Sequence, residues 1–346
     1  MNILFMIGNG FDVGVGLKTK FDDFLPYYVD KVKSHDKAII KFKEDIVRDG
    51  YETWADFEKK LGLYTQDFNI DTKEDFFTCR DDFVDELINY LREEEKNARF
   101  TGAGSIIDVF VDSLTGFHKK NRLLEGSAVS IAQAFAQHRN FRHHYNFITF
   151  NYTNVLTSCV NILRKLSSPI THNTSSGRVA DMITEPLHIH GTLDDGVLIG
   201  VNDESAIAQD VFSVDPDFAS RFVKPGMNAL LKNTKHEKGA ELVNSSDIIC
   251  VFGMSMGETD ATWWQLIANW LLENNGRQLV LWDYVPSYSR ANPANTIKHN
   301  QRVANRFFDI VDMTGEERRL VEDQVHVGIN SGGENDLFKI TLADKH

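Results

Sequence analysis

Four short polar segments carry the residues of this chain whose types and spacing suit chemistry on a small ligand. They are Gly8–Asp12, Thr149–Thr153, His188–Gly191 and Gly253–Asp260. Each segment directly follows a short apolar run of the kind that forms a buried strand. Ligands of open α/β sheets bind beyond the carboxyl ends of the strands, so we expect the four segments to line one common pocket.

The first segment, with the sequence GNGFD, has the outline of a phosphate-binding turn. A strand that runs into glycines and then into a helix directs backbone N–H groups toward a pyrophosphate. The spacing is not that of the dehydrogenase pattern G-x-G-x-x-G, because Val13 stands at the third glycine position. The same residues also suit an ordinary tight connection between a strand and a helix, so both interpretations stay open.

The second and third segments offer an amide and an imidazole. Asn151 stands at the end of its strand, where it suits ligand binding or the N-cap of the next helix. His188 and His190 are two residues apart and share a strand face, which would allow a pair of metal ligands. No third ligand has an obvious spacing, and a histidine at a strand end also serves as a hydrogen-bonded structural residue.

The fourth segment joins small residues to a hydroxyl and a carboxylate. Ser255 lies among small residues that let a ribose or a phosphate approach closely. Asp260 either caps the following helix or accepts a hydrogen bond from a ligand hydroxyl. The tryptophans that follow, Trp263, Trp264 and Trp270, are expected in the core rather than at the ligand.

Six short runs rich in β-branched or aromatic residues predict the strands that position these segments. They are Ile3–Ile7, Tyr145–Phe150, Pro186–His190, Val197–Val201, Asp247–Phe252 and Gln278–Tyr284. Between the first two runs, apolar residues recur every three or four positions, as at Phe83, Leu87 and Leu91, which predicts helices. Because the partners of the first strand all follow this stretch, we interpret it as a helical insertion packed against the open end of the sheet.

The predicted elements divide the chain into three parts. They are an α/β core with a parallel sheet (1–20 and 140–312), a large helical insertion after the first strand (21–139) and a C-terminal extension (313–346). The extension is mostly polar. Two strand-like pieces within it, Val325–Ile329 and Leu337–Leu342, predict a terminal hairpin.

The composition favours a small ligand over a nucleic acid or a membrane. The chain has 346 residues and a formal net charge of −13, which opposes broad binding to phosphate backbones. No apolar run approaches the roughly 18 residues that cross a bilayer, and the N-terminus lacks the basic start and the cleavage site of a signal peptide. Cys79, Cys159 and Cys250 form neither a metal-binding pattern nor a disulfide framework, so we expect a cytoplasmic protein.

The order of the four segments resembles the sirtuin-like NAD-binding core, in which a glycine turn precedes an Asn loop, a His-Gly pair and a Gly-x-Ser loop. The chain resembles the bacteriophage abortive infection AbiH family more closely. That resemblance also takes in Leu17, Phe24 and the run Trp54-Ala55-Asp56-Phe57-Glu58. It extends from residue 3 to about residue 264, and the combination of motifs is specific although each motif is short.

The resemblance implies a Rossmann-like parallel sheet with a sirtuin-like core, and a role in antiphage defence in a bacterium. Sirtuin-like defence proteins typically destroy NAD, with an Asn and a His at the reacting ribose, and these correspond to Asn151 and His190. Two departures concern the same site: Thr153 stands where that group usually has a carboxylate, and Asp12 stands where sirtuins have a serine. The sirtuin zinc ribbon is missing from the sequence, so we do not expect peptide deacetylation.

We therefore expect NAD as substrate or ligand and no metal, with hydrolysis of the nicotinamide–ribose bond as the reaction. The predicted catalytic residues are Asn151, His190 and Asp12, with neutral His190 as the base because an ordinary histidine has a pKa of about 6.5. The predicted nucleotide-binding residues are Gly8, Asn9, Gly10, Phe11, Thr149, Gly191, Gly253, Ser255 and Asp260. Asp56 and Glu58 are expected to complete the pocket from the insertion.

The alternative function is that of a non-catalytic sensor, which binds NAD, ADP-ribose or a related nucleotide and signals through a partner. Thr153 in place of a carboxylate favours this alternative. The glycine spacing disfavours a dehydrogenase, and the net charge disfavours a nuclease. The sequence leaves open whether a second copy of the chain or a partner protein of the defence system takes part.

Overall fold

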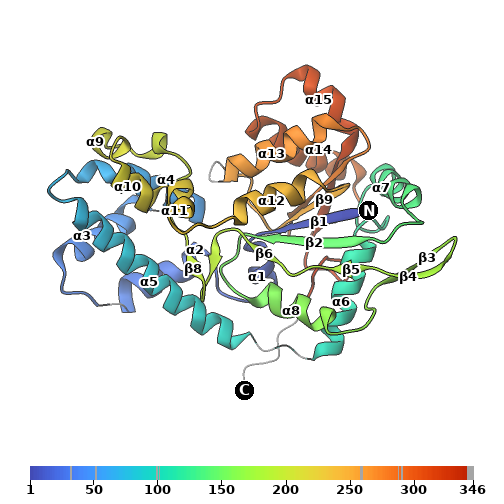
Figure 1. The fold of residues 1–346 in the computed structure, drawn as a ribbon, viewed down its shortest axis with the longest axis horizontal. Helices are drawn as coiled ribbons and strands as arrows, with labels where there is room; N and C mark the ends of the chain where they lie inside the picture. Colours follow the sequence, from blue (N-terminus) through green and yellow to red (C-terminus); the bar gives the residue numbers. More distant parts are fainter. Residues whose placement is uncertain are drawn as a thin grey trace.

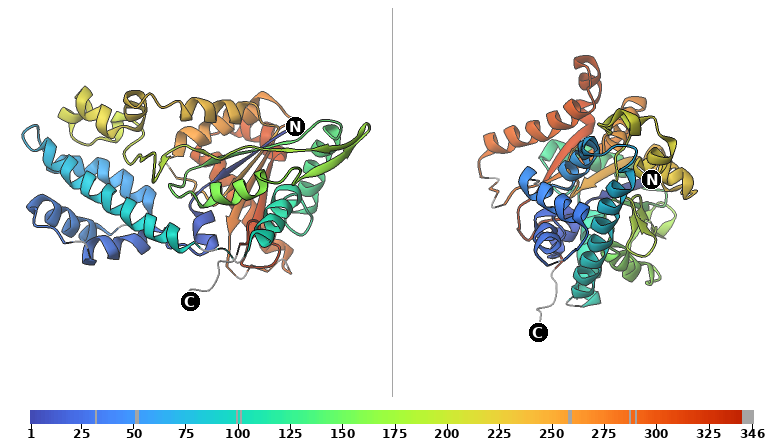
Figure 2. Two further views of the ribbon diagram at one scale, coloured as in Figure 1. Left: turned by 60° about the horizontal axis from the view of Figure 1, so that its bottom comes forward. Right: turned by 90° about the vertical axis from the view of Figure 1, so that its left-hand side faces the viewer.

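The computed structural model describes residues 1–31, 33–50, 53–98, 100, 102–257, 260–286, 288–289 and 291–340. A sheet of parallel strands lies at the centre with helices on both faces, and a lobe of helices extends from one end of the molecule (Figure 1). Figure 2 shows the lobe beside the sheet from two further directions. The chain is thus an α/β protein with a Rossmann-like parallel sheet and a large helical insertion after the first strand, as predicted.

Within the described residues, the central sheet has seven strands in the order β11-β10-β9-β1-β2-β5, with β6 also paired to β2. They are β1 (Asn2–Ile7), β2 (His144–Thr149), β5 (Met182–Ile183), β6 (Leu187–His188), β9 (Ile248–Phe252), β10 (Gln278–Tyr284) and β11 (Val325–Asn330). Every pairing within this sheet is parallel. The strands that precede the four polar segments, β1, β2, β6 and β9, are therefore parallel neighbours whose carboxyl ends share one edge, as predicted.

Strand β1 shows why these strands have continuous apolar sequences. Ile3, Phe5 and Ile7 pack into the cluster on one face of the sheet. Leu4 and Met6 pack into the cluster on the other face. All five side chains are fully buried, because a parallel sheet is covered on both sides by the helices that connect its strands.

Two sets of helices cover the two faces of the sheet (Figures 1 and 2). Helices α1 (Gly10–Val15), α6 (Ala103–Gly116), α7 (Glu125–Gln137) and α8 (Val155–Arg164) bury apolar side chains with Ile3 and Phe5. Helices α12 (Lys235–Asn244), α13 (Ala261–Glu273), α14 (Pro293–Ile310) and α15 (Gly315–Val321) bury theirs with Leu4 and Met6. The tryptophans of α13 lie in this second layer and are at most 3% exposed, as predicted.

A third apolar cluster fills the helical lobe, and it draws on two distant parts of the chain. Its helices are α2 (Phe21–Pro26), α3 (Lys37–Asp49), α4 (Trp54–Tyr64), α5 (Lys73–Asn97), α9 (Asp210–Ser213) and α10 (Pro216–Phe222). Phe83, Leu87 and Leu91 of α5 are buried in this cluster, which confirms the helix predicted from their spacing. The lobe is therefore built from two parts of the chain. Helices α2 to α5 lie between β1 and β2 in sequence, and helices α9 and α10 follow β2.

The remaining elements are short. They are α11 (Lys224–Leu230), a π-helical turn η1 (Tyr27–Lys31), the 3₁₀ turns η2 (Thr65–Asp67), η3 (Glu204–Ala206) and η5 (Glu322–Gln324), and the strands β3 (Thr171–Thr174), β4 (Gly177–Ala180), β7 (Gly191–Thr192) and β8 (Gly196–Val197). Of the predicted strand Val197–Val201, only Val197 lies in a strand, β8, which pairs with β7 outside the main sheet, and Val201 forms an isolated bridge with Val223. Its apolar side chains Ile199 and Val201 are instead buried in the lobe cluster.

The predicted C-terminal hairpin is wrong. Strand β11 pairs in parallel with β10 and extends the central sheet by one strand. Leu337, Phe338 and Ile340 form no strand, and they bury their side chains in the cluster of the α1 face. Residues 341 and 342 of that prediction lie outside the described residues. The apolar spacing marked these segments correctly as buried, but it did not identify their partners.

The helices and the cysteines bear on the expectations about membranes and disulfides. None of the described helices combines the length and the apolar character that a membrane span requires. Cys79, Cys159 and Cys250 are free and buried.

Candidate functional site

A cavity of about 320 Å³ opens at the carboxyl ends of β1, β2 and β9 and is closed on its far side by the helical lobe. The predicted site residues that line it are Gly8, Asn9, Asp12, Asn151, His190, Gly253, Ser255 and Asp260. The lobe and its connections contribute Thr19, Lys20, Phe21, Trp54, Phe57, Glu58 and Lys224. Its volume is at the lower end of the range for small-molecule sites, and its walls are mainly apolar with a few polar groups.

The glycine turn after β1 packs directly against the loop after β9. The N–H of Gly10 donates a hydrogen bond to the carbonyl of Gly253 over 2.8 Å. A Cβ atom on Gly10 would lie only 2.5 Å from the Cα of Gly253. Gly10 has no positive φ, so its backbone conformation alone does not demand glycine. Its glycine is required by close approach of two backbones instead.

The N–H groups of this turn are largely consumed by the protein itself. Gly8 donates to the carbonyl of Phe252, Gly10 donates to Gly253, and Phe11 donates to Gly8. The turn therefore holds two loops together, and these three N–H groups are not available as donors to a phosphate. Polar donors for an anionic ligand are available in the same cavity from Lys20 and Ser255, whose side chains are exposed there.

Asp12, the carboxylate of the first segment, is 1% exposed. The hydroxyl of Thr153 donates a hydrogen bond of 2.6 Å to its Oδ2. Burial raises the pKa of Asp12 from 3.8 to about 7, although Thr153 and the nearby Asn151 act in the opposite direction. Among the described residues, Oδ1 of Asp12 has no hydrogen-bond partner, although it is buried.

Asn151 is held by its backbone, which leaves its side chain free. Its N–H donates to the Oγ1 of Thr149 over 3.2 Å, and Nδ1 of His188 lies 3.0 Å from its carbonyl oxygen. Both side-chain atoms of Asn151, Oδ1 and Nδ2, are buried and have no hydrogen-bond partner in the part of the chain that the structure describes. Asn151 is not the N-cap of α8, because that position is occupied by Asn154.

His188 is a structural residue. Its Nδ1 donates to the carbonyl of Asn151, and its Nε2 lies 2.8 Å from the hydroxyl of Thr157, which is the donor in that tautomer. Burial lowers its pKa, which favours this neutral form. Because both ring nitrogens are engaged, His188 orients the Asn151 loop and does not form a metal-ligand pair with His190.

His190 lies at the cavity and faces a carboxylate. Its Nε2 is 3.7 Å from the Oδ1 of Asp260, and the two side chains are 14% and 18% exposed. The following residue, Gly191, has a φ of 84°, and a Cβ there would lie 1.7 Å from the carbonyl oxygen of Gly196. Gly191 begins β7 in a conformation that only glycine accepts, and the turn between β6 and β7 leaves His190 beside the cavity.

The other predicted residues shape the site without lining the cavity. Thr149 is fully buried beneath the Asn151 loop, and Phe11 is buried in the core with its ring against Phe110 and Phe338. Gly10 and Gly191 set the close turns described above. Residues 258 and 259 of the fourth segment lie outside the described residues.

The two acidic residues predicted from the insertion have different positions. Asp56 lies at the exposed start of α4, where its carboxylate accepts from the hydroxyl of Thr53 over 2.6 Å. Glu58 lines the cavity and is paired with Lys224 at 2.9 Å. Lys224, the first residue of α11, is 7% exposed and was not predicted, because a single lysine has no motif around it. A charge within an otherwise apolar run, FVKPG, was the available signal.

Taken together, the cavity contains a buried amide, a buried carboxylate whose pKa is raised to about 7 by burial, and an imidazole beside a second carboxylate. A search of curated protein sequences finds no match to the chain. The family model of bacteriophage abortive infection AbiH matches residues 4–282, which include all four polar segments and the lobe. The chain therefore belongs to the bacteriophage abortive infection AbiH family.

Proposed function

We propose that this chain is an abortive-infection defence protein that binds NAD in the cavity and hydrolyses its nicotinamide–ribose bond. Family membership supports the role in abortive infection. The observation that carries the chemical part is the set of buried atoms without a hydrogen bond of good geometry among the described residues: Oδ1 of Asp12 with Oδ1 and Nδ2 of Asn151, although the Asn151 amide lies near enough to Asp12 to lower the pKa of that carboxyl. Buried polar atoms are rarely unpaired in proteins, so a polar ligand is expected to pair with them.

Asn151 and His190 suit the attack of water on the ribose. Loss of nicotinamide gives C1′ of the ribose oxocarbenium character, and water then forms the new C–O bond. The electron pair of the broken C1′–N bond goes to the nicotinamide ring, which leaves as a neutral molecule. His190 accepts the proton of the water, the nearby Asp260 carboxylate stabilises the imidazolium that forms, and Asn151 positions the water or a ribose hydroxyl.

The pair of Asp12 and Thr153 bears on whether the site is catalytic. In the sirtuin-like group that the chain resembles, the carboxylate is expected at position 153 and a hydroxyl at position 12. Here the two groups are exchanged and joined by the 2.6 Å hydrogen bond. Thr153 was the feature that favoured a sensor, but the carboxylate is supplied by Asp12 from the neighbouring loop. Asp12 can accept from a ribose hydroxyl and stabilise the developing positive charge.

The lobe supplies the remaining wall of the proposed NAD site. Phe21, Trp54 and Phe57 form a cluster of aromatic rings, and the indole N–H of Trp54 donates to the carbonyl of Thr19. These rings provide an apolar surface for a nicotinamide or adenine ring. Lys20 and Ser255 provide donors for the phosphates, in place of the turn N–H groups that are already used.

The experiment that tests this proposal separates hydrolysis from binding. Purified full-length chain is incubated with NAD, and nicotinamide and ADP-ribose are quantified by chromatography. In parallel, the affinity for NAD is measured by calorimetry for wild type and for the Asn151→Ala variant. We expect both products and measurable binding. Binding without products would support the sensor instead, and the lack of both would contradict the proposal.

A further inference from the structure

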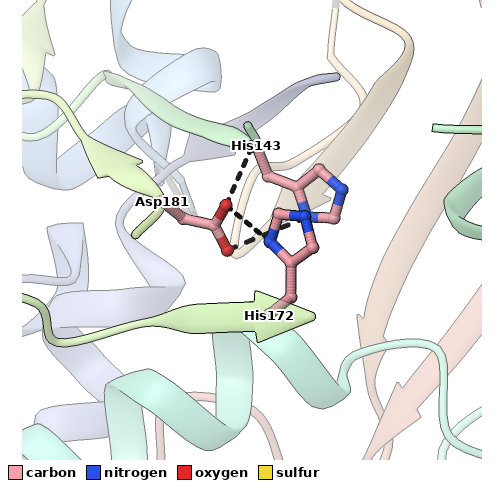
Figure 3. Close-up of side chains that lie close together, drawn as sticks. All are labelled: His143, His172 and Asp181. Atoms are coloured by element: carbon pink, nitrogen blue, oxygen red, sulfur yellow. Dashed lines mark hydrogen bonds and ion pairs between the residues drawn. The ribbon is translucent and has the colours of Figure 1, made fainter. Parts of the chain in front are cut away.

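A cluster of two histidines and an aspartate lies at the opposite end of the sheet from the cavity. His143 immediately precedes β2, His172 is on β3, and Asp181 lies between β4 and β5. One ligand atom from each residue lies within 4.8 Å of the other two (Figure 3). We propose that these three side chains bind one divalent transition-metal ion such as Zn²⁺.

The donor atoms suit such an ion by type and by distance. Two imidazole nitrogens and one carboxylate oxygen are ordinary zinc ligands, whereas Mg²⁺ and Ca²⁺ prefer oxygen alone. Nδ1 of His172 lies 2.9 Å from Oδ1 of Asp181, and Nδ1 of His143 lies 3.8 Å from Oδ2 of Asp181. Ligands at about 2.0–2.1 Å from a tetrahedral ion are separated by about 3.3 Å, which falls between these distances.

The hydrogen bonds of the cluster leave atoms available for an ion. Oδ1 of Asp181 accepts from the backbone N–H of His143 over 2.8 Å, which fixes the orientation of the carboxylate. Oδ2 of Asp181 and both ring nitrogens of His172 are buried and have no hydrogen bond within the described ranges. The 2.9 Å approach of His172 to Asp181 is therefore close without hydrogen-bond geometry. An ion would satisfy these atoms together.

The two imidazoles differ in their freedom to adjust. Their rings are stacked, with centroids 4.1 Å apart and an interplanar angle of 4°. Because a nitrogen lone pair lies in its ring plane, one ring must turn for both to face the same ion. The side chain of His172 is 19% exposed and belongs to the β3–β4 hairpin, which projects from the body of the molecule (Figure 1), whereas that of His143 is 6% exposed. We therefore assign the turn to His172.

The position of the cluster indicates a structural ion. Strand β2 runs from the cluster to the cavity over six residues, which spans roughly 20 Å at about 3.3 Å per residue. The ion therefore lies too far from the NAD site to take part in the proposed reaction. It would connect the start of β2 to the β3–β4 hairpin and to β5, a two-residue strand that pairs with β2 at His144 and Tyr145.

The test uses full-length chain that has been treated with chelator and returned to metal-free buffer. Zn²⁺ is titrated by calorimetry into wild type and into the variants His172→Gln and His35→Gln. His35 is exposed, so its variant is the control for adventitious binding at the surface. We expect one ion per chain for wild type and His35→Gln, with a rise in melting temperature. Loss of a direct ligand in His172→Gln should lower affinity at least about tenfold, the minimum seen for outer-shell partners.

A measurement on the wild-type chain alone keeps the proposal open to refutation if the variant does not fold. X-ray absorption at the zinc edge should show two imidazole nitrogens in the first shell of the bound ion. Absence of stoichiometric binding to wild type, unchanged affinity of a folded His172→Gln, or a shell without two imidazoles would each overturn the proposal. The cluster would then be a packed histidine–aspartate group only.

Discussion

Asp12 is the single residue whose environment most strongly defines the site. Its raised pKa means that the folded chain keeps a proton that the unfolded chain loses above about pH 4. The stability that this proton contributes is complete below about pH 4 and is lost as the pH rises to about 7. Relative to Asp12→Asn, wild type should lose about 1 kcal/mol of unfolding free energy per pH unit across that window.

The measurement is urea unfolding of both proteins at several pH values between about 4 and 8. Asp71→Asn serves as the control, because it removes an exposed carboxylate without altering the buried pair. Parallel stability curves for wild type and Asp12→Asn would show that Asp12 titrates at its ordinary pH, and the buried carboxylate would lose its assigned role.

Single residues also show the limits of the sequence. Asn151 and His190 were identified because each follows an apolar strand, and the ends of parallel strands meet at one edge. The roles of His188 and Thr149 in supporting Asn151 were not identified, since a hydrogen bond to a backbone carbonyl leaves no pattern in the sequence. Lys224 was missed because its partner Glu58 is distant in sequence.

Among the elements, the contact between the loop after β1 and the loop after β9 fixes the geometry of the cavity floor. A methyl group on Gly10 would meet the backbone of Gly253, and this backbone cannot move without displacing its strand. Gly10→Ala should therefore lower the free energy of unfolding by about 1–3 kcal/mol, as overpacked sites do. NAD affinity should fall as well, because Gly8 and Gly253 both line the cavity.

Gly14→Ala is the matched control for this prediction. It lies in the same helix α1, but its added Cβ would have no neighbour within 4 Å. That variant should be as stable as wild type or up to about 1 kcal/mol more stable, because alanine favours the helix. Equal stabilities for the two variants would contradict the close approach at Gly10.

At the scale of the whole molecule, the segment after residue 312 is part of the fold. Strand β11 covers the edge of β10, and Phe338 packs against Phe5 and Phe11 of the core. A chain ending at residue 312 would expose an apolar strand edge, so we expect it to aggregate and to unfold without a cooperative transition. Thermal unfolding followed by circular dichroism checks this, and a cooperative transition at the wild-type temperature would contradict it.

The same segment shows how much of the fold can be predicted from the sequence. Strands β1, β2, β6, β9 and β10 followed from short apolar runs, because burial on both faces demands such runs, whereas the short strand β5 was not predicted. The place of β11 did not follow, since an apolar run indicates a strand but does not specify its neighbour. The lobe was predicted as one insertion, yet its core also includes Phe212, Phe218 and Phe222 from after β8.

The most direct test of the central claim is the release of nicotinamide from NAD by wild type and His190→Ala. Loss of the base should lower turnover by roughly 10²–10⁴-fold while NAD affinity and melting temperature change little. His35→Ala, an exposed histidine away from the cavity, should match wild type. A stably folded His190→Ala protein with full wild-type turnover would remove His190 from the mechanism, and a wild-type chain that never releases nicotinamide would contradict the account as a whole.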